Sequence, residues 1–291
     1  MQLIRSFLIV GLALCLSACG ERALNSPYAE GAAAQNTLFT AFTQRSPKYL
    51  DPASSYSTDE TPFTYSIYEP LYGYHYLKRP YELEGRTAVE VVRPYYLDEA
   101  GERLPADAPG ELIAESVYEI TIKPDILYQP HPAFARNEQG QYRYYPMQAE
   151  DLKDTYAIPD FKYTGTRELT AHDYVYGFKR LASPRVISPI YAFFTDYIVG
   201  YKEYGSLLRE INQTQPSEQW LDLREYGFEG VEAVDDHTLR IRIKGKYPQF
   251  SYWLAMTFTA PIPWEADRFY HQPGMKEHDL SLNTWPINNF K

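Results

Sequence analysis

Apolar and polar residues alternate most clearly in two stretches, and both predict strands with one buried face. In residues 116–123 three apolar positions two apart, Tyr118, Ile120 and Ile122, alternate with polar ones. In residues 238–243 and the lysine that follows, the same period places apolar and basic side chains on opposite faces. The apolar ones are Leu239, Ile241 and Ile243, and the basic ones are Arg240, Arg242 and Lys244. Asp235-Asp236 separates this strand from the apolar run 231–234, so the two runs are predicted to form a hairpin.

Weaker alternation predicts two further strands, at residues 36–43 and 88–97. The turn-rich sequence between 97 and 116 indicates a connection. Residues 129–169 are polar, rich in tyrosine and proline, and lack a clean period. We expect an ordered but irregular insertion there.

A helical period appears in four places. Thr61 before Pro62 has the pattern of an N-cap with proline at the first helical position, and this short helix should end near Pro70. The pair Thr170 and Asp173 has the spacing of a capping box, and Pro184 should stop the helix that follows.

The other two helical regions are less regular. Residues 189–211 carry apolar side chains at helical spacing, although Gly200 and Gly205 could interrupt them. Residues 248–256 predict one more short helix.

The N-terminus has the features of an exported protein. Residues 7–16 are almost wholly apolar, which is too short to span a bilayer but has the length of a secretory signal. Leu16-Ser17-Ala18-Cys19 then resembles the lipobox of bacterial lipoproteins, in which the cysteine is acylated and the preceding segment is removed. We therefore expect residues 1–18 to be a lipoprotein signal peptide, 19–34 a flexible tether and 35–291 the folded part. The alternative is an ordinary signal peptide with a chance cysteine.

Cysteine content limits the chemistry of the mature chain. Its only two cysteines are Cys15 and Cys19, and Cys15 would leave with the signal. No disulfide framework, cysteine nucleophile or cysteine metal site is then expected. His271 and His278 are seven residues apart, too far along a helix to share one ion without help, and we predict no metal and no cofactor.

Charge and composition bear on the partners. The 291 residues hold 38 acidic and 28 basic side chains, and this acidic balance argues against nucleic acid as a partner. Tyrosine is abundant, at 28 residues, and suits wet binding clefts as well as ordinary aromatic cores. None of the common hydrolase, metalloprotease, dinucleotide or P-loop motifs occurs. The acidic pairs Asp235-Asp236 and Glu150-Asp151 fit turns and helix starts better than acid–base catalysis. We expect a binding protein and not an enzyme.

Three stretches together resemble the family 5 extracellular solute-binding proteins of ABC importers, which bind oligopeptides, dipeptides or nickel. They are "LDPASSYSTDE" with the helix after it, "LTAHDYVYGFKRLASP" and "VEAVDDHTLRIRIKGKYPQFSYWLA", and they occur in the family's order. The chain departs from the family pattern at Gln129-Pro130-His131, where an aromatic residue and Asp-Gly are usual, and at Pro70, where a small residue is usual.

The resemblance implies an α/β fold. Residues 35–291 would be the N-terminal part of lobe 1 of a type II periplasmic binding protein, with a mixed sheet and flanking helices. The chain would then be an N-terminal fragment, whose lobe is incomplete without the C-terminal part. It also implies capture of peptides in the cell envelope or periplasm by a monomer held at the membrane through the lipid on Cys19. The partners would be an ABC permease and its ATPase.

By position in the first loop, Tyr56, Ser57 and Thr58 are the expected ligand contacts. The same residues also fit a plain Ser/Thr-rich turn that leads into a helix. Two other functions stay open: an envelope hydrolase or glycan-processing lipoprotein, and a non-transport receptor or scaffold on the same fold. Turnover that depends on particular carboxylates would favour the hydrolase or glycan-processing protein. The absence of a neighbouring permease gene would favour the receptor or scaffold.

Overall fold

The structure is a computed structural model that describes residue 31 and residues 47–216, 219–272 and 275. The predicted first strand at 36–43 and the predicted lipidation site Cys19 lie outside the described residues. Every element below belongs to the unit formed by Arg45–Lys291.

The strands, in chain order, are β1 (Tyr72–Tyr74), β2 (Leu83–Gly85), β3 (Tyr95–Leu97), β4 (Arg103–Leu104), β5 (Glu115–Thr121), β6 (Val231–Asp235) and β7 (Thr238–Lys244). The α-helices are α2 (Thr61–Ile67), α3 (Ala149–Leu152), α4 (Ala171–Leu181), α5 (Tyr191–Tyr197), α6 (Tyr201–Thr214), α7 (Phe250–Trp253) and α8 (Trp264–Tyr270). Short 3-10 helices are η2 (Gly110–Leu112), η3 (Pro132–Phe134), η4 (Ile158–Asp160), η5 (Leu223–Glu225) and η6 (Thr257–Thr259).

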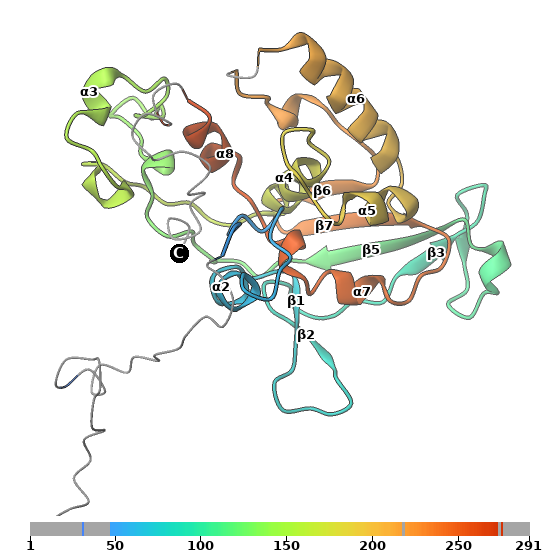
Figure 1. The fold of residues 1–291 in the computed structure, drawn as a ribbon. Coiled ribbons are helices and arrows are strands. Elements are labelled where there is room, and N and C mark those ends of the chain that lie inside the picture. The colour runs from blue at the N-terminus through green and yellow to red at the C-terminus, as the bar shows by residue number, and fades with distance from the viewer. Residues whose placement is uncertain (1–30, 32–46, 217–218, 273–274, 276–291) are drawn as a thin grey trace, which may run out of the picture. The chain divides into compact units, whose positions relative to one another are not determined.

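A five-stranded sheet in the order β4-β3-β5-β7-β6 organises the fold, and β1 and β2 form a separate two-stranded sheet (Figure 1). The register of β5 on β7 puts Tyr118 opposite Ile241 and Ile120 opposite Leu239. These four apolar side chains therefore share one face, where each is at most 1% exposed. The two best-patterned strands and the hairpin are confirmed.

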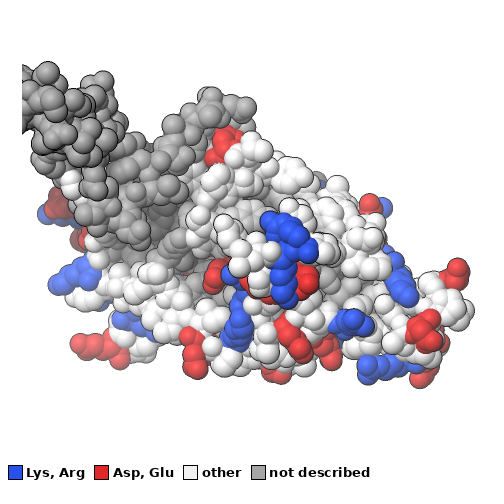
Figure 2. Space-filling view, turned by 90° about the horizontal axis from the view of Figure 1, so that it is seen from below, with Lys and Arg blue, Asp and Glu red and all other residues white. Residues whose placement is uncertain are grey.

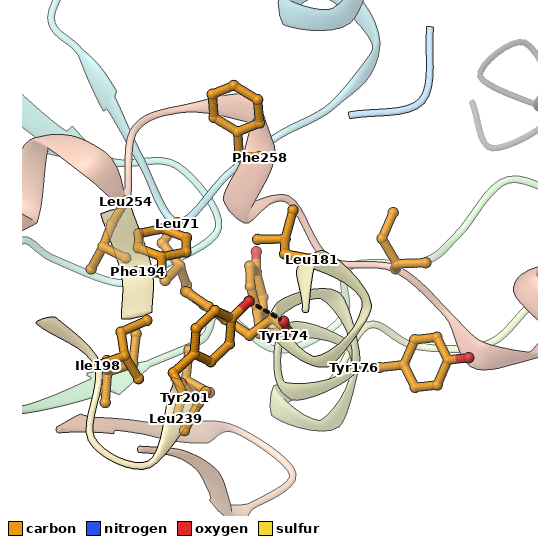
Figure 3. Packing of buried hydrophobic residues seen from close by; sticks show 14 of the residues in the cluster. Leu71, Tyr174, Tyr176, Leu181, Phe194, Ile198, Tyr201, Leu239, Leu254 and Phe258 are labelled. Atoms are coloured by element: carbon orange, nitrogen blue, oxygen red, sulfur yellow. Dashed lines mark hydrogen bonds between the residues drawn. The ribbon is translucent and has the colours of Figure 1, made fainter. Parts of the chain in front are cut away.

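Helices cover this apolar face. α4 contacts both β6 and β7, and α5 contacts β7. Figure 3 shows Tyr174 and Leu181 of α4, Phe194 of α5 and Leu239 of β7 meeting in the core. The opposite face carries ion pairs such as that between Arg240 Nη2 and Glu119 Oε1, 2.7 Å apart. The predicted combination of sheet and flanking helices is confirmed. The predicted sheet was mixed, which requires at least one parallel pair of strands. All strand pairs among the described residues are antiparallel.

The helix predicted after Thr170 is confirmed. The Asp173 carboxylate accepts a hydrogen bond from the Thr170 N–H at 3.0 Å, as in a capping box, and the helix ends at Leu181, ahead of Pro184.

The helical region at 189–211 is broken once. Gly200, in the left-handed conformation with φ of 70°, separates α5 from α6, and Ile198 there forms a bridge to Ile243 of β7. Gly205 lies inside α6 without interrupting it. Glycine is required at this position because the Tyr191 ring occupies the space that a Cβ atom would need.

The insertion at 129–169 is irregular, as predicted, with only α3 and two 3-10 helices. It forms its own apolar cluster with α8, which Figure 1 shows beside it in red. His131 is fully buried there, with Nε2 3.0 Å from the Tyr270 hydroxyl and Nδ1 accepting from the Ala133 N–H.

Two boundaries differ from the sequence prediction. The strand predicted at 88–97 is reduced to Tyr95–Leu97, because the Val92 N–H donates to the Tyr72 hydroxyl and Pro94 has no N–H to pair. Thr61 is the first helical residue and not the cap, since the Ser57 carbonyl already accepts from the N–H groups of Glu60 and Thr61.

No helix in the described ranges has the length and apolar character needed to cross a membrane.

Candidate functional site

The predicted ligand residues lie together in the loop that precedes α2. The Tyr56 side chain is 66% exposed, and its ring centroid lies 5.6 Å from that of Phe258 in η6. Ser57 is half-buried and Thr58 is exposed. All three are at least partly accessible to solvent, and their contact with a ligand stays a prediction.

A buried carboxylate shapes this loop from within. Glu60 is 1% exposed, and its two carboxylate oxygens accept hydrogen bonds from four main-chain N–H groups, those of Lys48, Tyr49, Tyr56 and Ser57. Burial opposes the charge on Glu60, but these donors outweigh it and hold its pKa below the usual range.

The Glu60 contacts decide what the loop can offer. The N–H groups of Tyr56 and Ser57 are engaged by Glu60, and the Ser57 carbonyl accepts from the N–H groups of Glu60 and Thr61. Ligand contacts at these two residues are therefore left to the Tyr56 carbonyl, the tyrosine ring and the hydroxyl groups. The neighbouring Ser55 hydroxyl is buried and has no hydrogen-bond partner among the described residues.

An ion-pair network fastens the start of the loop to two helices. Arg180 of α4 donates to both carboxylate oxygens of Asp51, at 2.8 and 2.7 Å, and to Asp267 of α8 at 3.1 Å. Asp267 also accepts from the Tyr176 hydroxyl at 2.6 Å and from the Trp220 indole at 2.9 Å. Burial disfavours the charged form of Asp267, but the attraction of His271 and Arg180 for the carboxylate outweighs this and lowers the pKa of Asp267. With two carboxylates bound, Arg180 has little left to offer an anionic ligand.

Two cavities adjoin this arrangement. One of about 180 Å³ is lined by Asp51, Arg180, Asp267 and Trp220. The other, of about 520 Å³, lies beside α2 and is lined by polar and apolar side chains together, among them Tyr65, Ser66, Ile67, Glu69, Leu127 and Gln129. A cavity of this size and lining suits one or two ligand side chains.

Sequence reasoning missed Glu60 and Arg180 as the residues that hold the loop. Asp51 and Arg180 each occur in one of the recognised motifs, but 129 positions separate them and no pattern joins them. Within the described ranges, no three His, Cys, Asp or Glu side chains are grouped so as to hold a metal ion. His278 of the histidine pair is outside those ranges.

Comparison with known proteins identifies the class to which this chain is related. No protein-family model matches it. Its sequence relatives are oligopeptide-binding proteins, and the resemblance to family 5 solute-binding proteins is thereby confirmed.

The relatives are two proteins named periplasmic oligopeptide-binding protein OppA. That of Salmonella typhimurium is 26% identical over 186 residues, which cover 62% of this chain and 30% of the relative. That of Escherichia coli is 30% identical over 135 residues, which cover 44% of this chain and 22% of the relative. The matches thus span less than a third of either protein. The solved structure of the Escherichia coli murein tripeptide binding protein MppA aligns at 18% identity and a TM-score of 0.43, covering 76% of this chain and 30% of that one.

Proposed function

We propose that the chain serves in peptide capture, as part of the lipid-anchored solute-binding component of an ABC importer in the bacterial cell envelope. The observation that carries the proposal is the sequence similarity to two proteins named for oligopeptide binding. The motif order and the lipobox-like Leu16-Ser17-Ala18-Cys19 support it.

In this proposal the loop before α2 supplies ligand contacts through its side chains. The Tyr56 ring offers apolar area with a polar tip, and the Thr58 hydroxyl can donate to or accept from a peptide main chain. The Ser57 hydroxyl, which hydrogen-bonds Glu60, can accept from one. Glu60 and the Asp51–Arg180 pair hold the loop in place before ligand arrives, which reduces the entropy lost on binding.

Recovery of bound peptides from the native protein tests this function. The full chain is expressed in cells with its signal, purified, and its low-molecular-weight contents are identified by mass spectrometry. We expect short peptides with the unaltered protein and markedly fewer with Tyr56→Ala. Tyr76→Ala is the matched control, since Tyr76 is an exposed tyrosine (85%) on the β1–β2 connection. Recovery of sugars alone, or equal loss with both variants, would contradict the proposal.

The membrane anchor is tested separately with Cys19→Ser. Two or more acyl chains hold a protein stably on a bilayer, so the unaltered protein should fractionate with membranes. The variant should appear in the soluble fraction after cell disruption. Unchanged membrane association of the variant would argue against lipidation at Cys19.

A further inference from the structure

A groove of about 520 Å³ lies between the β1–β2 hairpin, strands β3 and β5, and the segment around α7. It has no residue in common with the loop before α2 or with the cavity beside that helix. All its lining residues are described, and they come from four separate parts of the chain. The proposed peptide capture does not use this groove.

Tyrosine rings form its walls. Tyr81, Tyr96, Tyr247 and Tyr252 line the opening, and the buried Tyr118 lines the inside. The Tyr74 ring, next to the groove, supports two of these rings: its centroid lies 6.0 Å from that of Tyr81 and 6.1 Å from that of Tyr252, and the second pair is stacked. Rigid rings of this kind provide flat apolar surface at low cost in conformational entropy.

Two cations and one acid also line the groove, and the acid is neutralised locally. Glu82 pairs with Lys78, with Oε2 2.6 Å from Nζ. Lys246 lies with its Nζ 4.9 Å from the centre of the Tyr96 ring and donates to the Ala108 carbonyl at 3.3 Å. Arg93 is exposed and forms no hydrogen bond or ion pair with any described residue. The groove therefore presents an unused guanidinium next to aromatic walls.

This positive charge is a local feature of an acidic protein. The chain has a formal net charge of −10. Figure 2 views the side on which the β1–β2 hairpin projects in Figure 1, and there positive and negative side chains are interspersed among uncharged areas. A ligand would thus be selected by the groove itself and not by a broad field of one sign.

We propose that this groove is a second ligand site, which takes a carboxylate that carries an aromatic ring. The ring lies against the tyrosine wall, and the carboxylate pairs with Arg93, whose planar donors match both carboxylate oxygens. Lys246 contributes less, because its ammonium is shared with the Ala108 carbonyl. Such a group could come from a free aromatic acid or from the C-terminal residue of a peptide.

Ligand-detected NMR titration of the full chain tests the site, with phenylacetate as the probe and phenylacetamide as its neutral analogue. We expect saturable binding of phenylacetate that is at least about tenfold tighter than that of phenylacetamide, since a hydrogen-bonded ion pair is lost with the amide. The dipeptide Ala-Phe, with a free carboxylate, distinguishes the two sources through the part of its binding that Arg93→Gln removes. If this part is tighter than the binding of phenylacetate, the ligand is a peptide end; if it is weaker, the ligand is a free acid.

Charge variants locate the site. Arg93→Gln should weaken phenylacetate binding about tenfold, and Lys246→Gln less than that. Arg103→Gln is the matched control, because Arg103 lies over the Tyr95 ring at 4.5 Å but does not line the groove. Absence of binding to the unaltered chain, equal binding of acid and amide, or equal effects of Arg93→Gln and Arg103→Gln would each overturn the proposal. Arg93→Gln should leave the peptides that are lost with Tyr56→Ala still recovered from cells, which separates this site from the proposed peptide site.

Discussion

The two apolar clusters of the described structure are held together by different means. The cluster on the sheet is built from side chains that repeat every two residues in strands and three to four in helices, such as Ile120, Leu239 and Phe178. The cluster of the insertion has no such period. Its chain segments are joined by polar side chains: the Gln272 amide accepts from the Met147 N–H and donates to the Tyr144 carbonyl, both at 2.8 Å.

A buried ion group links the insertion to the rest of the structure. Arg167 donates to Asp173 of α4 and to Glu265 of α8, at 2.8 Å each, and both carboxylates are at most 3% exposed. Where the backbone is regular, its own hydrogen bonds and apolar burial act together. Where the backbone is irregular, side chains must satisfy the buried polar groups, so stability depends on a few specific residues.

The largest effect should come from breaking the ion group. Arg167→Met leaves Asp173 and Glu265 buried without their cation, which should lower the free energy of unfolding by about 4 kcal/mol. Urea denaturation followed by circular dichroism measures this. A loss below about 1 kcal/mol would mean that the insertion is held by its apolar contacts alone.

The second-largest effect should come from truncating a buried leucine to alanine, and the loss of stability should differ between the two clusters. Leu239→Ala, at a fully buried position of β7, should cost on the order of 3 kcal/mol because the sheet leaves a cavity that cannot collapse. Leu152→Ala, 6% exposed in the four-residue helix α3, should cost less because the insertion can relax around it. Equal losses in thermal or urea unfolding would remove the contrast between the two clusters.

Acid should affect the insertion through His131. Burial lowers the pKa of His131 to about 3, against 6.5 in the unfolded chain. Between these two pH values the unfolded state binds a proton on His131 that the folded state does not. The free energy of unfolding is therefore highest above about pH 6.5 and falls as the pH decreases. The slope due to this residue approaches about 1.4 kcal/mol per pH unit. Unfolding curves from pH 7 to 5 should show this slope, and His131→Gln should flatten it. An unchanged slope in the variant would assign the acid sensitivity elsewhere.

The smallest effect is expected on the solvent face of the sheet. Arg240 bridges Glu119 and Glu232, but all three side chains are at least 31% exposed. Arg240→Gln should cost only about 0.5 kcal/mol, and 1 M NaCl should abolish the difference from the unaltered protein. A salt-independent loss comparable with that of Arg167→Met would show that surface and buried ion pairs are equivalent here.

The sheet was predictable because its pattern is local. Alternation in 116–123 and 238–243 identified β5, β7 and their buried faces, and the Thr170–Asp173 spacing identified the start of α4. The strand predicted at 88–97 was mostly wrong, since the partner of the Val92 N–H is a hydroxyl 20 positions away. The exposed positions of Tyr56 and Thr58 are compatible with the predicted loop contacts, while peptide binding there stays a prediction.

The sequence by itself determined the strands and helices whose periods and caps lie within a few residues. It also showed the order of the three motifs along the chain. Only the tertiary structure decided which charges meet. Arg180 pairs with Asp51 and Asp267, and Glu60 accepts from main-chain N–H groups of its loop. Arg93, at the tyrosine-walled groove, has no ion-pair partner among the described residues. The physical reason is that a charged side chain can pair with any opposite charge the fold brings within reach, so spacing along the chain does not specify its partner.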